Sequence, residues 1–191
     1  MGKGRDIGSL LAPLDKVDTQ AYLGVGLHSL GLLGWILAQT GKADVYVSTF
    51  STSEQFLRGF YNLRKKGLVN SAVLLADLKV SNKTVKLYRE MSLCFDTTFL
   101  GQNHSKVILV RNRNYTVSVV TSQNQTYGDR AECSVVTTSA AIYKQLFDGL
   151  LYIINNKSFQ LNGLFNKLAQ RDRADGITDD AGCRDWHPFG Y

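Results

Sequence analysis

Cysteine and histidine are both scarce in this chain of 191 residues, which contains three of each. Cys94, Cys133 and Cys183 are widely spaced and odd in number, so neither a disulfide scaffold nor a thiolate metal site is expected. Cys94 and Cys133 stand beside apolar residues and are interpreted as small buried side chains. This use of cysteine favours a reducing compartment, and we expect a cytoplasmic protein.

Clusters of acidic residues are lacking as well. Asp77, Asp96 and Asp129 are scattered and are interpreted as strand-end and loop residues, unlike the grouped carboxylates that hold magnesium in two-metal nucleases. We therefore expect no metal and no cofactor. The formal net charge is +6, which mildly favours a polyanionic partner such as nucleic acid or an anionic membrane surface.

One long apolar stretch, AYLGVGLHSLGLLGWILAQ over residues 21–39, has nearly the length of a membrane span. It contains His28, Ser29 and four glycines, however, and has no basic flank close by. We expect a buried helix over 21–39 and no membrane partner, with His28 in the core or an interface. The glycines would let this helix pack closely against a neighbour, such as a second copy of the chain.

Three parts are predicted along the chain. Residues 1–20 form an N-terminal arm, which looks loose over 1–17, and residues 21–155 form a single domain. From residue 156 to residue 191 the chain is polar, has no apolar periodicity and is interpreted as a C-terminal tail.

Within the domain, apolar residues recur at strand or helix spacing in successive segments. The predicted elements are strands over 43–50, 71–80, 104–112, 115–124 and 132–138, a strand near 96–101, helices over 51–67 and 139–155, and a short helix near 83–91. Ser51 or Ser53 can cap the helix over 51–67, and Ser139 can cap the last helix. This order predicts an α/β domain with a mixed β-sheet flanked by helices.

One short motif, NHSKV, places His104 and Lys106 two residues apart on a predicted strand, so that their side chains point the same way. Ser122 and Asn124 share a face of the next strand, and neighbouring strands would bring all four to one end of the sheet. This set suits a phosphate, because a histidine can attack phosphorus while lysine and asparagine hold the non-bridging oxygens. Glu132 could accept a hydrogen bond from the imidazole and fix its tautomer.

These residues resemble the second half of the phospholipase D superfamily motif, in which His-x-Lys is followed by a Gly-Ser-x-Asn strand end and a later acidic residue. By this resemblance His104 is the nucleophile or general acid. Lys106 and Asn124 match the phosphate clamp. Ser122 matches the supporting hydroxyl and Glu132 the group that orients the histidine.

The resemblance covers residues 43–155 and departs from the family pattern at two positions. Arg111 stands where the family motif has an aspartate, and Thr121 stands where it has a glycine. The tyrosyl-DNA phosphodiesterase branch of the superfamily uses a His-Lys-Asn set without that aspartate. The resemblance therefore implies a small, nuclease-like member with a single reduced motif.

The family chemistry uses two histidines, one to attack phosphorus and one to protonate the leaving oxygen. His28 and His187 lie outside any His-x-Lys pattern, so a working site implies two copies of the chain related by a two-fold axis. The resemblance implies a metal-independent phosphodiesterase that forms a covalent phosphohistidine, which water then hydrolyses.

Basic residues near the predicted motif favour nucleic acid as the substrate. Arg64, Lys65 and Lys66 end a helix, and Arg111 and Arg113 stand in the turn RNRN, where each could contact backbone phosphates. We therefore expect a homodimeric nuclease. The alternative is a catalytically degenerate relative that keeps the fold as a module binding nucleic acid or a protein assembly.

Overall fold

The computed structural model describes residues 7–80, 87–126 and 130–161, and places them in one layered α/β unit. The strands are β1 (Thr19–Gly24), β2 (Ala43–Thr49), β3 (Val69–Asp77), β4 (Thr97–Gly101), β5 (Val107–Arg111), β6 (Thr116–Thr121), β7 (Glu132–Thr137) and β8 (Ser158–Gln160). The helices are α1 (Ser29–Thr40), α2 (Glu54–Lys65), α4 (Tyr88–Cys94) and α5 (Ala140–Lys157), with 3-10 turns at η1 (Ile7–Ser9) and η2 (Leu78–Val80). The residues of the predicted tail from 162 onward, and with them Cys183 and His187, lie outside the described part.

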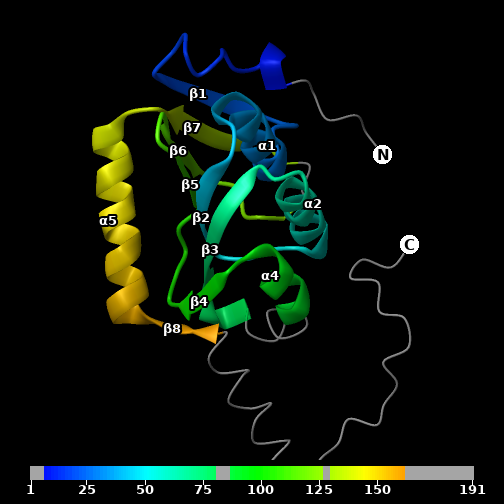
Figure 1. Cartoon of the computed structure of the whole chain (residues 1–191), viewed down its shortest axis with the longest axis vertical. Helices are drawn as coiled ribbons and strands as arrows, with labels where there is room; N and C mark the ends of the chain where they lie inside the picture. Colours follow the sequence, from blue (N-terminus) through cyan, green and yellow to red (C-terminus); the bar gives the residue numbers. More distant parts are fainter. Residues whose placement is uncertain (1–6, 81–86, 127–129, 162–191) are drawn as a thin grey trace, which may run out of the picture.

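All eight strands belong to one mixed sheet, in the order β1-β7-β6-β5-β2-β3-β4-β8. Pairing is parallel between β2 and β3 and between β3 and β4, and it is antiparallel between the other neighbours. Helix α5 covers one face of the sheet, whereas α1, α2 and α4 lie on the other face (Figure 1). The predicted class, an α/β fold with a mixed sheet flanked by helices, is confirmed.

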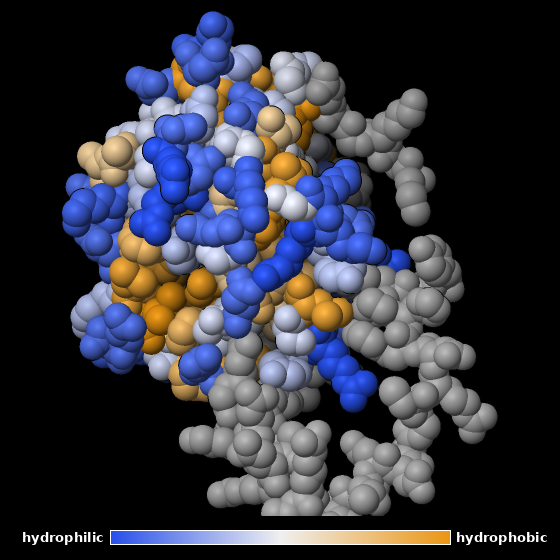
Figure 2. Space-filling view, in the orientation of Figure 1, coloured by the Kyte–Doolittle hydropathy of each residue, from blue (hydrophilic) through white to orange (hydrophobic). Residues whose placement is uncertain are grey.

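The two faces of the sheet bury separate hydrophobic clusters, because side chains alternate along each strand. Ile108 and Val110 of β5 join the larger cluster beneath α1, α2 and α4, whereas Leu109 between them packs with Tyr143 and Leu150 of α5. A slip of one residue would exchange these faces, so burial fixes the register of β5. Hydrophobic side chains also reach the surface beside the C-terminal half of α5 (Figure 2).

Local capping signals are placed as the sequence predicts. The Ser53 hydroxyl accepts a hydrogen bond from the Phe56 amide at 3.2 Å and begins α2, and Ser139 does the same for α5 with the Ile142 amide at 3.4 Å. Gly67 has φ 73°, a left-handed conformation that suits glycine and lets the chain turn from α2 into β3.

The single helix predicted over 21–39 is wrong. Residues 19–24 form β1, which pairs with β7 at the edge of the sheet, and α1 begins only at Ser29. Gly26 lies between the two elements with φ 97°, so the chain reverses where a continuous helix was expected. Within the described ranges, no helix combines the length and the apolarity needed to cross a bilayer.

The loose arm predicted over 1–17 is also wrong for the residues that the structure describes. Leu11 and Leu14 are each 4% exposed and belong to the larger hydrophobic cluster. The Gln20 side chain exchanges two hydrogen bonds of 2.8 Å with the backbone of Ala12, which ties this segment to β1. Apolar residues too few to show a periodicity are nonetheless buried by tertiary packing.

Two smaller predictions also change. The ordered chain continues past residue 155, because α5 extends to Lys157, β8 pairs with β4, and Leu161 is 2% exposed. Cys94 is buried as predicted, and burial raises the pKa of its thiol to about 12. Cys133 is exposed, together with its neighbour Leu23 on the outer strand β1, so its predicted burial is wrong.

Candidate active site

The segments that carry the predicted site meet at one end of the central strands. Strands β2 and β6 finish at this end while β5 and β7 begin there, because β5 pairs antiparallel with β2 and β6, and β6 pairs antiparallel with β7. Ser48 near the end of β2 lies opposite Val107 at the start of β5, and Val107 lies opposite Val120 near the end of β6. The topology therefore brings together the loop between β4 and β5 and the loop between β6 and β7.

His104 and Lys106 lie in the loop just before β5, and Ser122 and Asn124 lie just after β6, so none of the four is on a strand as predicted. The chain nevertheless continues the pairing of the strands for one more step. The Thr121 amide donates to the Lys106 carbonyl at 3.0 Å, which holds the two loops beside each other. The predicted convergence follows from this extension of the ladder.

The structure brings the five predicted catalytic residues to one open pocket of about 420 Å³. The residues that line it are His104, Lys106, Ser122, Gln123, Asn124, Thr126, Arg130, Ala131 and Glu132. Three side chains that are or can become cationic, His104, Lys106 and Arg130, therefore face a single carboxylate. Arg130 was missed by the sequence analysis, because an arginine in a loop carries no local signal of its position.

His104 is exposed at the pocket and packs its ring against Phe50, with 5.1 Å between the ring centroids. Lys106 Nζ donates to the His104 carbonyl at 2.9 Å and lies 3.4 Å from His104 Nδ1. An ammonium group can only donate, so this contact favours a neutral ring with its proton on Nε2. In that tautomer Nε2 carries the proton and has no free lone pair.

The partner of Glu132 differs from the prediction. Its carboxylate accepts a short hydrogen bond from the Ser122 hydroxyl, and that hydroxyl accepts from the Cys133 amide at 3.0 Å. Among the described residues, no hydrogen bond joins Glu132 to His104. Within one chain, Glu132 fixes Ser122 at the pocket and does not orient the imidazole.

Two buried glutamines anchor the segment that carries Ser122 and Asn124. Gln123 is 5% exposed, and its Oε1 accepts from the Ser29 amide at 2.6 Å, which satisfies an N–H in the first turn of α1. Gln125 is fully buried, and its backbone N–H donates to the Ser51 carbonyl at 3.1 Å. The alternation in SQNQ thus points the glutamines inward and leaves Ser122 and Asn124 toward the pocket.

Asn103 holds the loop of His104 from its buried side, and the sequence did not indicate this role. It is 4% exposed, and its Nδ2 lies within 3.0–3.3 Å of Ser48 Oγ and the Thr49 and Leu75 carbonyls. Its Oδ1 accepts from the Ser105 amide at 3.1 Å and the Ser105 hydroxyl at 2.7 Å. The loop between β4 and β5 is thereby tied to the ends of β2 and β3.

Asp77, which was interpreted only as a strand-end residue, supports the same loop. It is 5% exposed at the end of β3, and its two carboxylate oxygens accept from the backbone N–H groups of Asn103 and Lys79, each at 2.7 Å. Asp77 does not line the pocket, so its contribution to the site is to position the backbone before His104.

The five basic residues predicted to contact nucleic acid lie away from this pocket. Arg111 is the last residue of β5, and β5 begins at the pocket, so Arg111 and Arg113 lie at the opposite end of the strands. Lys65 and Lys66 lie at the same far end, because α2 ends where β3 begins. The expected position beside the phosphate site is wrong, because the turn follows the C-terminal end of β5 whereas the pocket lies at its N-terminal end.

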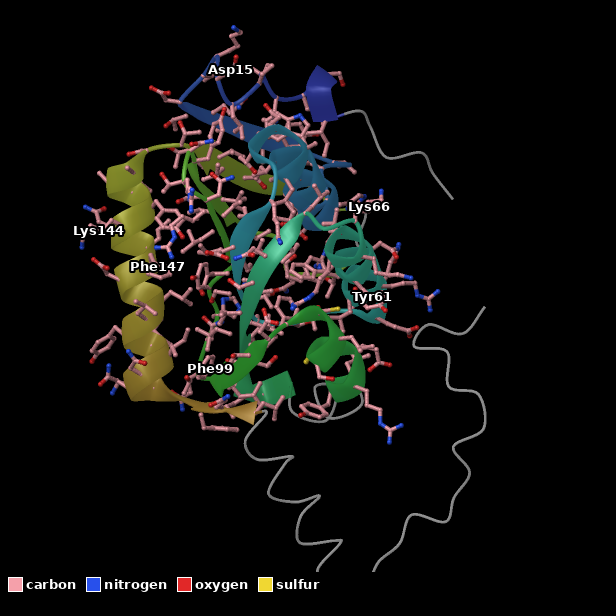
Figure 3. The ribbon with its side chains drawn as sticks, viewed as in Figure 1. Asp15, Tyr61, Lys66, Phe99, Lys144 and Phe147 are labelled. Atoms are coloured by element: carbon pink, nitrogen blue, oxygen red, sulfur yellow. The ribbon has the colours of Figure 1, made fainter. Side chains whose placement is uncertain are left out.

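Several of these side chains also have partners within the fold. The Arg64 guanidinium donates to the Cys94 carbonyl at 2.9 Å and forms a short ion pair with Asp96. Arg111 stacks on Phe147 of α5 at 5.3 Å from the ring centroid, and Lys65 lies 5.7 Å from the Tyr61 ring. Figure 3 shows Phe147 on α5, and Tyr61 and Lys66 at α2 on the other side of the sheet.

The position of Arg111 changes the meaning of the missing aspartate. An aspartate at residue 111 would be seven residues from His104 along an extended chain, roughly 20 Å away. It would face α5 and not the pocket, as Arg111 does. The substitution therefore removes nothing from the pocket of this chain.

The fold defined by this sheet, with the pocket at the ends of its central strands, is that of the phospholipase D type. The chain is similar to Nuc from Salmonella typhimurium, a phospholipase D family member, with a TM-score of 0.55 and 16% identity over 74% of this chain and 97% of Nuc. It is similar to NucT from Helicobacter pylori, with a TM-score of 0.55 and 11% identity over 73% of this chain and 98% of NucT.

A phosphatidylserine synthase from Haemophilus influenzae has the same fold, with a TM-score of 0.50 and 14% identity over 83% of this chain and 47% of that protein. No family model matches the chain, and no curated protein matches it significantly in sequence. These comparisons establish the fold, and the substrate has to be argued from the residues.

Proposed function

We propose that this protein is a metal-independent phosphodiesterase, most specifically a nuclease, that acts through a phosphohistidine at a site shared by two subunits. The observation that carries the proposal is the pocket that gathers His104, Lys106, Ser122, Asn124 and Glu132 from the β4–β5 connection, the β6–β7 connection and the start of β7. The set combines a nucleophile with donors for the oxygens of a phosphodiester.

The pocket can stabilise the negative charge on the non-bridging oxygens of the phosphate during attack. Lys106 and Asn124 donate to the non-bridging oxygens, and Arg130 adds a second permanent cation at the rim. Ser122 donates its one hydroxyl hydrogen to Glu132 and accepts from the Cys133 amide, so it fixes its segment beside this clamp and does not itself donate to the phosphate.

Binding of a phosphate would also change the state of His104. Both catalytic roles need a proton on Nδ1, whereas Lys106 Nζ now faces that atom at 3.4 Å. A phosphate oxygen between Lys106 and Asn124 attracts the ammonium away from the ring. Nδ1 can then donate to an acceptor in the pocket, and Nε2 becomes free to attack.

The reaction proceeds in two displacements that need two histidines. In the first, Nε2 of His104 bonds to phosphorus while the bond to the leaving oxygen breaks, and that oxygen takes a proton from the imidazolium of the partner subunit's His104. In the second, water attacks phosphorus, the phosphorus–nitrogen bond breaks, and the partner's His104 takes a proton from the water. Both histidines return to their starting states.

Nucleic acid is the proposed substrate because the pocket is rich in cations and the chain carries a formal net charge of +6. A second candidate function is a non-catalytic module that binds nucleic acid. It is favoured by two contacts, the ammonium beside His104 Nδ1 and the engagement of Glu132 with Ser122. Both leave the imidazole of a single chain without an acceptor.

Cleavage of labelled single- and double-stranded DNA in EDTA, by wild type and His104→Ala side by side, separates these functions. The enzyme should cut without metal, and the variant should lose cutting while melting at nearly the same temperature, because His104 is exposed. Salt-dependent DNA binding with no cleavage by either protein would instead support the binding module. A monomer under assay conditions would overturn the shared site.

A further inference from the structure

A second group of cations lies at the ends of the strands that are farthest from the pocket. It comprises Lys42 before β2, Lys66 after α2 and Arg113 in the turn after β5, and we call it the distal basic surface. The Asn112 side chain donates to the Thr40 carbonyl at 2.7 Å and to the Lys42 carbonyl at 3.3 Å, so the turn of Arg113 lies against Lys42.

Helix α2 delivers Lys66 to the same place. The Ala43 amide donates to the Leu68 carbonyl at 3.1 Å, and Ala43 pairs with Val69 at the start of β3. Lys42 is therefore adjacent to the segment that follows Lys66. Three loops, distant in sequence, present one cation each at this end of the molecule.

These three cations have no ion pair within the described residues, in contrast to other basic side chains of the protein. Lys16, Arg58 and Lys144 pair with Asp15, Glu54 and Asp148 at 3.4, 2.7 and 2.6 Å. The distal basic surface thus keeps its charge available.

One acidic side chain, Asp44, lies at this surface and is held there by neutral donors. Asp44 Oδ1 accepts from the side-chain amide of Asn70 at 2.8 Å and from the Ser71 hydroxyl at 2.7 Å. Burial alone would raise the pKa of Asp44, but these hydrogen bonds and the nearby Arg111 outweigh it and lower the pKa. A pocket of about 390 Å³ opens here between Lys42, Asp44, Arg111 and Arg113.

We propose that the distal basic surface is a second contact for the backbone of a nucleic acid, separate from the catalytic pocket. The inference rests on the proposed function. Its cations project from three loops and do not converge on one point, which suits the repeated phosphates of an extended polyanion better than a single phosphate group. The two sites lie at opposite ends of β5, roughly 20 Å apart by strand geometry.

The consequence is that a long strand can be held at one site while it reacts at the other. A small diester such as bis(p-nitrophenyl) phosphate reaches the pocket alone, whereas a strand of about thirty nucleotides can engage both sites and gain from the raised effective concentration. The distal basic surface would therefore determine the affinity for long substrates and leave the chemistry of short ones unchanged.

The test replaces Lys42, Lys66 and Arg113 by glutamine in the full chain. A matched control, Lys16→Gln with Arg58→Gln and Lys144→Gln, removes the same net charge from paired cations. Binding of a fluorescent 30-nucleotide single-stranded DNA is measured at 50–200 mM salt with His104→Ala in every background, so that no cleavage occurs. Turnover of bis(p-nitrophenyl) phosphate is measured in the backgrounds that keep His104.

We expect the distal variant to lower the slope of log affinity against log salt by about 2, since each lost contact to a single strand removes about 0.7. The control should keep the slope of the parent, and all the proteins that keep His104 should hydrolyse the small diester equally. Equal slopes for the two triple variants would overturn the inference. Binding of phosphatidylserine vesicles is measured with the same variants, and a decrease confined to the vesicles, with DNA binding unchanged, would overturn the inference as well.

Failure of the proposed function would look different. If the His104→Ala parent itself binds no DNA, the nucleic-acid function fails together with the inference. If the parent binds DNA and the two triple variants match it, only the distal basic surface is refuted.

Discussion

Replacement of Asn103 by alanine tests whether the catalytic loop is held from inside the fold. The side-chain amide of Asn103 has two donor hydrogens, which it shares among three acceptors, Ser48 Oγ and the Thr49 and Leu75 carbonyls. Its Oδ1 accepts twice from Ser105, so the side chain makes the equivalent of four hydrogen bonds. The side chain is 4% exposed, so water cannot readily replace these bonds. Four bonds at roughly 1 kcal/mol each predict a loss of about 2–4 kcal/mol.

The measurement is equilibrium urea unfolding followed by circular dichroism. Asn70→Ala is the matched control, because Asn70 is exposed and donates only one side-chain hydrogen bond, to Asp44. The free energy of unfolding of the control should stay within about 0.5 kcal/mol of the parent. A loss below about 1 kcal/mol for Asn103→Ala would show that the loop is held by other contacts.

The same variant should lose activity beyond its loss of stability. His104 directly follows Asn103, and a misplacement of about 1 Å in a catalytic group can cost about a hundredfold in rate. Turnover of bis(p-nitrophenyl) phosphate is compared at a temperature where both proteins are fully folded. Unchanged turnover in a folded Asn103→Ala protein would refute a positioning role for Asn103.

Three further predictions concern the shared site, acid stability and α5. In mixtures of equal amounts of wild type and His104→Ala, freely exchanging dimers with a shared site should show about one quarter of the activity of wild type at the same total protein concentration. Independent sites would show about one half. Burial alone would raise the pKa of Asp96, but hydrogen bonds from Arg64 and the Ala72 amide lower it. Its stabilisation is therefore present above pH about 4 and is lost as the pH falls through the lowered value. Asp96→Asn should cost about 1 kcal/mol or less at pH 7 and less than that at pH 2, and an equal cost at both pH values in urea unfolding would contradict this. Gly149→Ala should stabilise α5 by about 0.5–1 kcal/mol, since an added Cβ meets no atom within 4 Å, and a lower melting temperature would count against it.

Local patterns in the sequence determined much of the fold and of the candidate site. The caps at Ser53 and Ser139 depend on groups within three residues, and they are placed as predicted. His104 and Lys106, like Ser122 and Asn124, are separated by two residues in extended chain, so their common direction follows from local geometry even though they lie beyond the strand ends.

The tertiary structure decided what depends on partners far apart in the chain. Gln123 satisfies the Ser29 amide across 94 residues, and Arg111 is placed against Phe147 and away from the pocket. The strand β1 exists because it pairs with β7, and Leu11 is buried because α1 and the sheet leave room for it. Pairing and burial between distant segments override local propensity, which is why the sequence by itself predicted the groups of the site but not the network that holds them.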